Sequence, residues 1–89
     1  MTQAHIVFSG RVQGVGFRFT VQRFARQSKL TGWVRNCPDG TVEALIQGTR
    51  KGIDSLCEEL EQFFNGYITN KDIRYEDVAN PAKEFEIKH

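Results

Sequence analysis

Apolar residues recur along this chain at two spacings, one of two residues and one close to 3.6. Alternating or continuous apolar runs predict strands at 4–11, 31–36, 41–47 and 68–78, with Phe85 and Ile87 in a short terminal strand. Apolar positions at helical spacing form a first stripe of Phe17, Val21, Phe24 and Ala25, and a second of Ile53, Leu56, Cys57, Leu60, Phe63 and Phe64. Strands and helices therefore alternate along the whole chain.

Turn residues separate these elements. Pro38-Asp39-Gly40 predicts a turn between the second and third strands, because Pro presets φ and Gly accepts positive φ. Asn65-Gly66 ends the second helix. The resulting order, βαββαβ plus a short terminal strand, predicts an α+β fold of the ferredoxin-like split βαβ type. We expect an antiparallel sheet with two helices on one face, and Ile73 and Tyr75 pointing inward from the fourth strand.

A glycine-rich segment, Gly-Arg-Val-Gln-Gly-Val-Gly-Phe-Arg at 10–18, connects the first predicted strand to the first helix. Glycines let main-chain N–H groups turn inward and approach a ligand closely. A glycine-rich turn from strand to helix favours an anion, because free N–H groups and the helix dipole both attract negative charge. Arg18 lies at the start of the helix, and its guanidinium can donate to two phosphate oxygens at once. The segment is also compatible with a plain connection that carries a solvated charge.

Two familiar phosphate loops are excluded. A nucleoside-triphosphate loop requires Gly-Lys-Ser or Gly-Lys-Thr, and neither occurs here. Gly14 and Gly16 lack the third glycine of a dinucleotide fingerprint, and 89 residues are too few for that fold.

Charge is distributed unevenly. The net charge is +1, yet residues 1–38 contain six basic and no acidic residues, whereas 39–89 contain all 11 acidic residues. A nearly neutral total argues against bulk binding of nucleic acid or of a membrane surface. A local positive field around Arg18 suits a small anion.

Length and composition indicate a single domain over 1–89 with one core. No segment is long and apolar enough for a membrane span or resembles a signal peptide, so we expect a cytoplasmic protein. We expect Cys37 and Cys57 to be reduced, because such a compartment keeps thiols reduced and their spacing is not that of metal ligands. No cofactor or metal is expected.

Two motifs at a fixed spacing carry a family resemblance. Gly-Arg-Val-Gln-Gly-Val-Gly-Phe-Arg at 10–18 resembles the first signature of the acylphosphatases, and Gly-Trp-Val-Arg-Asn at 32–36 followed by Pro-Asp-Gly-Thr-Val-Glu at 38–43 resembles the second. Phe85-x-Ile87 resembles the closing strand of that family. The resemblance spans nearly the whole chain.

The resemblance implies hydrolysis of the mixed anhydride of acyl phosphates to a carboxylate and inorganic phosphate, without a metal or a covalent phosphoenzyme. It assigns phosphate binding to Arg18 and orientation of the attacking water to Asn36. Main-chain amides are expected to share the phosphate, namely those of Gln13, Gly14, Val15, Gly16 and Phe17. The chemistry agrees, because carboxylate is a good leaving group and the remaining tasks are positioning and charge stabilisation. From residue chemistry alone, a cap at the end of a strand is the favoured role of Asn36, and the motif reverses that preference.

Four other residues attract attention without a role at the site. His5 and His89 have no partner at the spacing of a general base or a metal site, so they are interpreted as surface or filling residues. Trp33 is expected to pack rather than to stack on a ligand, and Cys57 lies on an apolar helix stripe and is expected to be buried.

Two non-enzymatic functions remain as alternatives. The same element order occurs in RNA-binding modules, whose glycine and aromatic signature lies on the third strand; here residues 41–47 contain no aromatic residue. A regulatory domain of a larger carbamoyl-transfer maturation protein is the second alternative, and the complete pair of Arg18 and Asn36 favours the enzyme over it. We expect a monomer that binds a small acyl phosphate; its physiological acyl group is not legible in the sequence.

Overall fold

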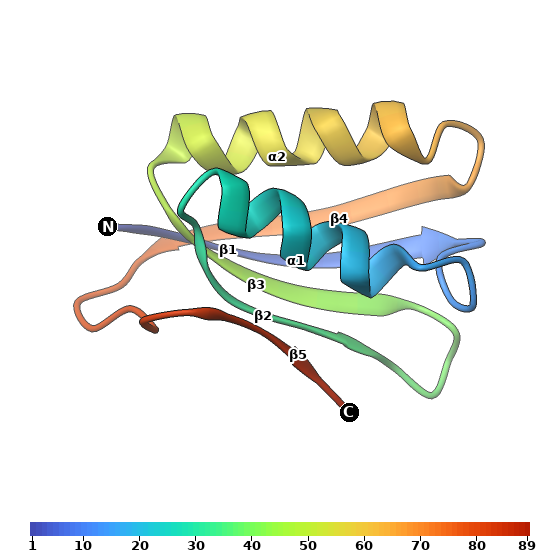
Figure 1. Ribbon diagram of the computed structural model, residues 1–89, viewed down its shortest axis with the longest axis horizontal. Coiled ribbons are helices and arrows are strands. Elements are labelled where there is room, and N and C mark those ends of the chain that lie inside the picture. Colours follow the sequence, from blue (N-terminus) through green and yellow to red (C-terminus); the bar gives the residue numbers. More distant parts are fainter.

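Two helices cover one face of a five-stranded sheet (Figure 1). The computed structural model describes every residue from 1 to 89. The elements follow in the order β1 (Thr2–Gly10), α1 (Phe17–Gln27), β2 (Thr31–Asn36), β3 (Val42–Gly48), α2 (Arg50–Phe63), β4 (Ile68–Asp77) and β5 (Phe85–Lys88). The predicted α+β split βαβ arrangement is therefore confirmed, and the ends of β1 to β4 differ from the predicted strand ends by at most two residues.

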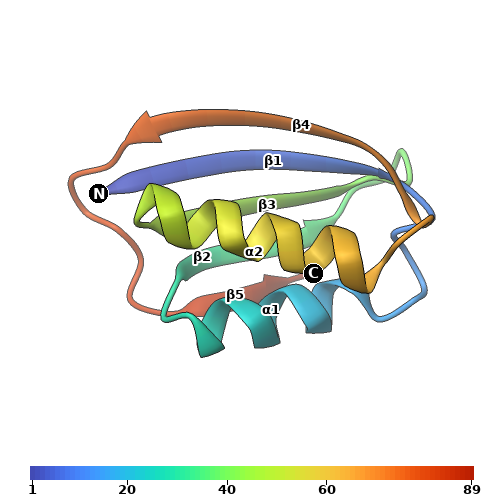
Figure 2. The same ribbon diagram turned by 90° about the horizontal axis from the view of Figure 1, so that it is seen from above.

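The strands lie in the order β4-β1-β3-β2-β5, as the view onto the helices shows (Figure 2). The pairs β1–β3, β1–β4 and β2–β3 are antiparallel, but β5 runs parallel to β2. The prediction of a wholly antiparallel sheet is thus wrong at β5. Strand β4 ends beside the start of β1, and segment 78–84 crosses from there to the start of β2, where the Gly32 N–H donates to the Glu84 carbonyl at 3.0 Å. A strand that begins at this end has to run in the same direction as β2.

The core lies between the helices and the sheet. Alternate residues of β1 and β3 point toward the helices and are fully buried, namely Ala4, Ile6, Phe8, Val42, Ala44 and Ile46. They meet Val21 and Ala25 of α1 and Ile53, Leu56 and Leu60 of α2, which are also buried. Ile73 and Tyr75 pack against this core as expected. These contacts follow the two spacings in the sequence, since strand side chains alternate and helix side chains return every three to four residues.

One apolar position departs from the predicted helix stripes. Phe63 is 57% exposed, although the spacing places it with the buried residues of α2. It is the last residue of the helix, and its ring lies at the rim of the molecule against Phe24, with ring centroids 5.6 Å apart. Phe64, the next residue, turns into the core in its place and contacts Phe17.

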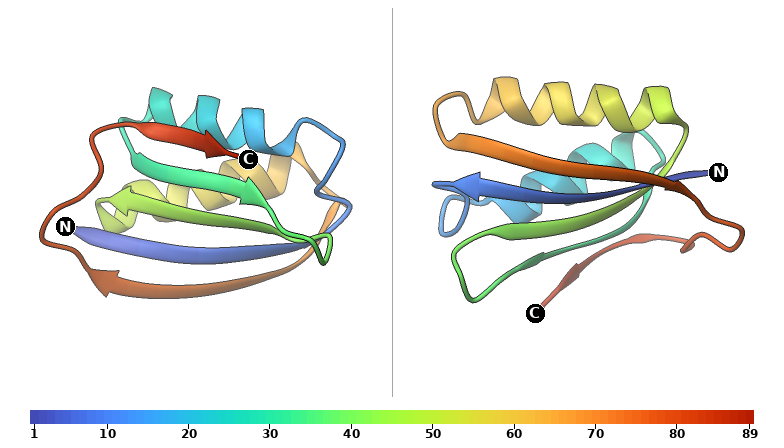
Figure 3. Two further views of the ribbon diagram at one scale, coloured as in Figure 1. Left: turned by 90° about the horizontal axis from the view of Figure 1, so that it is seen from below. Right: turned by 180° about the vertical axis from the view of Figure 1, so that it is seen from behind.

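The opposite face of the sheet carries no helix (Figure 3). Polar side chains bond to one another across its strands: Gln47 Nε2 donates to Gln3 Oε1 at 2.8 Å, and Gln3 Nε2 donates to Glu76. The two glutamine side chains are 9% exposed or less, so these bonds satisfy groups that water does not reach freely. Neither helix has the length and apolar character that a membrane-spanning segment needs.

Candidate functional site

The glycine-rich segment forms a loop between β1 and α1 at one end of the sheet (Figure 2). The turn between β2 and β3 lies at the same end. Val12 and Phe17 flank the loop and are almost fully buried, and the Phe17 ring packs against Phe8 with centroids 5.1 Å apart. These two apolar anchors hold the ends of the loop in the core. Between them Val15 is half-buried against the same core, whereas Gln13, Gly14 and Gly16 are exposed.

Two glycines give the loop its shape. Gly14 and Gly16 have φ values of +75° and +77°, which favour glycine because a Cβ is strained there. A Cβ at either position would meet no other atom within 4 Å, so the requirement is conformational rather than one of space. Left-handed residues between right-handed ones turn successive N–H groups toward the same side, which forms a concavity suited to anions. The local sequence thus dictates the loop geometry that was predicted from it.

Main-chain N–H groups along this loop have no acceptor in the protein. None of those from Val12 to Phe19 donates to a main-chain or side-chain oxygen, and pairing resumes with Thr20 N–H, which donates to the Gly16 carbonyl at 3.1 Å. The N-cap of α1 is Gly16, which has no side chain to satisfy the first turn, and no acidic residue lies in that turn. Unpaired N–H groups at a helix start carry partial positive charge and attract an anion.

Arg18 and Asn36 line one small pocket together with parts of this loop. The pocket has a volume of about 170 Å³ and is lined by Val12, Gly14, Gly16, Phe17, Arg18, Phe19 and Asn36. Arg18 is half-buried and forms no ion pair, although Arg35 and Arg50 each bind a carboxylate. The amide of Asn36, at the end of β2, likewise makes no side-chain hydrogen bond. Two residues that are 18 positions apart in the sequence thus present unsatisfied polar groups to the same space.

The structure brings together most of the residues predicted from the sequence. Gln13 and Val15 do not line the pocket, although their N–H groups belong to the same unpaired run. A larger hollow of about 560 Å³ lies at the β5 edge, beside Trp33 and Lys88. Two carboxylates, those of Glu84 and Glu86, line this hollow together with two ammonium groups, those of Lys83 and Lys88, so its lining has no net charge. The small pocket, in contrast, is lined by Arg18 and by no carboxylate, which suits an anion better.

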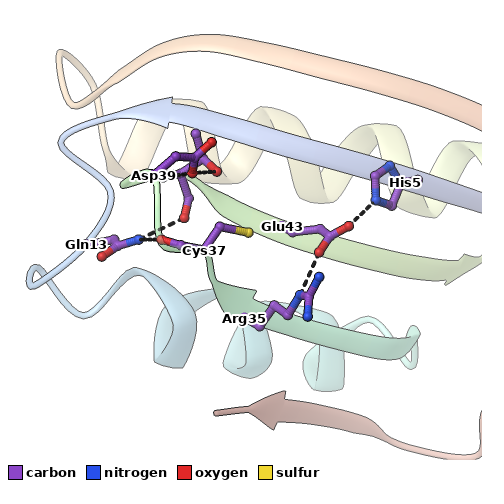
Figure 4. A network of polar contacts seen from close by, with 7 residues as sticks. His5, Gln13, Arg35, Cys37, Asp39 and Glu43 are labelled. Atoms are coloured by element: carbon purple, nitrogen blue, oxygen red, sulfur yellow. Dashed lines mark hydrogen bonds and ion pairs between the residues drawn. The ribbon is translucent and has the colours of Figure 1, made fainter.

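The side chain of Gln13 makes contacts that the sequence did not indicate. Its Nε2 donates to the Cys37 carbonyl at 2.8 Å and to the Thr41 carbonyl at 2.9 Å (Figure 4). Both carbonyls belong to the turn that follows Asn36. A hydrogen bond between loops depends on tertiary placement, so no motif or periodicity could have revealed it.

Two further predictions about single residues have clear outcomes. His5, interpreted as a surface or filling residue, contacts Glu43 on the neighbouring strand, and Glu43 also accepts from Arg35 at 2.6 Å (Figure 4). The hydrogen bond from His5 holds the pKa of the Glu43 carboxyl below its usual value. The sequence did not reveal this pair, because His5 and Glu43 come together only through the pairing and register of β1 and β3. Cys57 is buried as predicted, and burial raises the pKa of its thiol to about 11.

The side chains that could ligate a metal do not gather in the structure, where no three His, Cys, Asp or Glu residues form a group. Trp33 lies half-buried on the open face of the sheet, with the Lys88 Nζ 4.8 Å from its ring centroid. It therefore packs beneath cationic side chains and lies outside the pocket of Arg18 and Asn36.

Comparisons with known proteins show similarity over nearly the whole chain. The family model described as acylphosphatase matches residues 4–87. An acylphosphatase of Geobacillus kaustophilus is 38% identical over 90 residues, which cover 100% of this chain and 96% of that protein. One of Roseiflexus is 46% identical over 91 residues, covering 98% and 95%. The crystal structure of acylphosphatase from Bacillus subtilis superposes with a TM-score of 0.91 at 36% identity, with all of both chains covered. The chain belongs to the acylphosphatase family, whose members are hydrolases.

Proposed function

We propose that this protein hydrolyses acyl phosphates by direct attack of water, with Arg18 and the loop amides binding the phosphoryl group and Asn36 orienting the water. The observation that carries the proposal is the meeting of an unpaired guanidinium, unpaired N–H groups and a free amide side chain in one pocket. The donors around this pocket bear positive or partial positive charge, which matches a phosphoryl group.

The phosphoryl group is held by charge and by directed donors. The Arg18 guanidinium donates to two phosphoryl oxygens, and the N–H groups of Gln13, Gly14, Val15, Gly16 and Phe17 surround the others. Charge spreads over the equatorial oxygens in the transition state of phosphoryl transfer, so donors that are fixed in advance stabilise it. The apolar anchors Val12 and Phe17 supply that rigidity.

The bond changes are simple. The oxygen of water forms a bond to phosphorus while the bond from phosphorus to the carboxylate oxygen breaks, and a proton of the water passes to solvent or to a phosphate oxygen. The Asn36 carbonyl oxygen accepts a hydrogen bond from the water and fixes its direction of approach. Little base strength is needed because the carboxylate leaves readily.

The wider setting of the enzyme belongs to the same proposal. Residues 1–89 act as a single acylphosphatase-like domain, as a monomer in the cytoplasm, on a small acyl phosphate and without nucleic acid, membrane or cofactor. Positive charge at the phosphoryl group is supplied by Arg18, so the proposal includes turnover without a divalent ion.

Benzoyl phosphate hydrolysis tests the proposal. We expect purified protein to consume it equally fast with and without excess chelator, and inorganic phosphate to inhibit competitively. In water enriched in ¹⁸O, the label should enter phosphate and not benzoate. Activity that disappears with chelator and returns with a divalent ion contradicts metal-free turnover, and label in benzoate contradicts attack at phosphorus.

A further inference from the structure

The Gln13 side chain connects the two loops that carry the parts of the site. Its Nε2 donates to the carbonyls of Cys37 and Thr41, at 2.8 and 2.9 Å (Figure 4). An amide nitrogen has two N–H groups, and here each has its own acceptor. The opposite orientation of the amide would place its oxygen against two carbonyl oxygens, so the contacts also determine which atom is the nitrogen.

Both acceptors are already fixed inside the turn. The Cys37 carbonyl also accepts from Gly40 N–H at 3.1 Å, and the Thr41 carbonyl also accepts from Cys37 N–H at 2.9 Å. Asp39 tightens the same turn, because its Oδ1 accepts from the hydroxyl and the N–H of Thr41. Gln13 is therefore bound to a rigid turn whose first residue is the neighbour of Asn36.

We propose that Gln13 is a positioning residue, whose side chain sets the position of Asn36 relative to the phosphate-binding loop. This inference rests on the proposed function. Val12 and Phe17 anchor the loop, and strand pairing between β2 and β3 anchors Asn36, so each part keeps its own shape without Gln13. The two bonds from Gln13 are the side-chain hydrogen bonds that join one loop to the other.

The expected sizes of the effects on stability and on turnover distinguish this role from a merely structural one. Gln13 is exposed, so two hydrogen bonds that water can replace contribute little to stability. A shift of about 1 Å between reacting groups, in contrast, can lower a rate on the order of 10²-fold. The inference therefore predicts a large effect on kcat and a small effect on the melting temperature.

Gln13→Met tests this, since it keeps the length of the side chain and removes both donors. We expect kcat for benzoyl phosphate to fall roughly 10- to 100-fold, with KM and the inhibition constant of inorganic phosphate within about threefold, because Arg18 and the loop amides still hold the phosphate. Gln13→Ala should behave alike.

Gln22→Met is the matched control. Gln22 Nε2 also donates to a main-chain carbonyl, that of Phe85 at 3.1 Å, and neither residue lines the pocket. This variant should lose a similar amount of melting temperature and keep its kcat. If Gln13→Met keeps its kcat, or loses no more than Gln22→Met, the inference is wrong. It is also wrong if phosphate affinity falls in step with kcat, since Gln13 would then shape the anion site itself.

A double variant shows whether Gln13 acts through Asn36. In the Asn36→Ala background, Gln13→Met should lower kcat little further, because the group that it positions is gone. A full additional loss would overturn the inference. Wild-type turnover of benzoyl phosphate tests the proposed function separately, so an active wild type with an unaffected Gln13→Met variant contradicts only the role of Gln13.

Discussion

The two helices lie side by side on the same face of the sheet (Figure 1), but their N-termini are capped differently. At α2, the side chain of Thr49 accepts from Gly52 N–H at 3.0 Å, and Ile53 N–H donates to the Thr49 carbonyl at 3.0 Å. At α1, the N-cap is Gly16, and the N–H groups before Thr20 have no acceptor in the protein. The bond from Ile53 N–H has its counterpart at α1 in the bond from Thr20 N–H to the Gly16 carbonyl, so the two starts differ in the side-chain cap. We call the start of α2 closed, because Thr49 caps it, and the start of α1 open, because it has no side-chain cap.

The difference shows that α1 lacks a stabilising helix cap at the place where the candidate site would bind an anion. A side-chain cap stabilises a helix by roughly 0.5–2 kcal/mol, and α1 forgoes it beside Arg18 and Asn36. An anion that occupies the open start supplies the missing acceptors. One donor at the start of α2, the Gly52 N–H, already has a side-chain acceptor, and we expect no phosphate to bind there.

The largest effect is expected at the open start. Arg18→Ala should lower kcat/KM by at least about 10²–10³-fold, the usual loss for one preorganised donor, and should weaken inhibition by phosphate. The fold should survive, because Arg18 forms no ion pair. Arg26→Ala, at the other end of the same helix, is the control. Normal activity of the Arg18 variant would remove this residue from the mechanism.

Asn36→Ala should separate binding from reaction. We expect kcat to fall on the order of 10²-fold with little change in KM or phosphate inhibition, because water is aligned only during the reaction. Asn70→Ala, an exposed asparagine on β4, should be neutral. A parallel fall in phosphate affinity and melting temperature would mean that Asn36 shapes the loop instead.

Thr49→Ala addresses the closed start. Loss of its cap should cost about 1 kcal/mol of unfolding free energy and leave kcat unchanged, as denaturant titration and benzoyl phosphate kinetics can measure. Thr49→Ser keeps the hydroxyl and should restore most of the stability. A strong loss of activity in Thr49→Ala would contradict the separation of the two helix starts.

The smallest effect concerns pH and lies on the open face of the sheet. The pKa of Glu43 is lower in the folded protein than its ordinary value of 4.5, first because of His5 and then because of Arg35. The unfolded chain therefore binds more protons, so this stabilisation is present above about pH 4.5 and is lost as the pH falls through the folded pKa. In Glu43→Gln, melting temperature should depend less on pH below 4.5, with unchanged turnover at neutral pH. An unaltered acid profile would show that the contacts of Glu43 contribute nothing.

Local patterns predicted the elements that the local chain determines. A continuous apolar run identified β1, and alternation identified β3. Helical spacing identified the buried faces of α1 and α2, and Pro38-Asp39-Gly40 identified the turn. The glycines at 14 and 16 predicted the loop because positive φ is a property of single residues. Motif spacing predicted that Arg18 and Asn36 share one site, and the pocket places them together; their roles stay predictions.

Features that depend on how distant segments meet were missed. The direction of β5 follows from the route of segment 78–84, and the pair of His5 and Glu43 follows from the register of β1 on β3. The contacts of Gln13 require both loops to be in place. Phe63 and Phe64 both continue an apolar stripe, and only the end of α2 determines which one turns inward.

The difference between the two helix starts can be measured residue by residue. In a titration of the ¹⁵N-labelled protein with inorganic phosphate, followed by amide chemical shifts, we predict saturable changes at the N–H groups of 13–18 and none at 50–53. The midpoint should agree with the inhibition constant for benzoyl phosphate hydrolysis. Unchanged amides at 13–18 at phosphate concentrations that inhibit, or equal changes at both helix starts, would contradict the account.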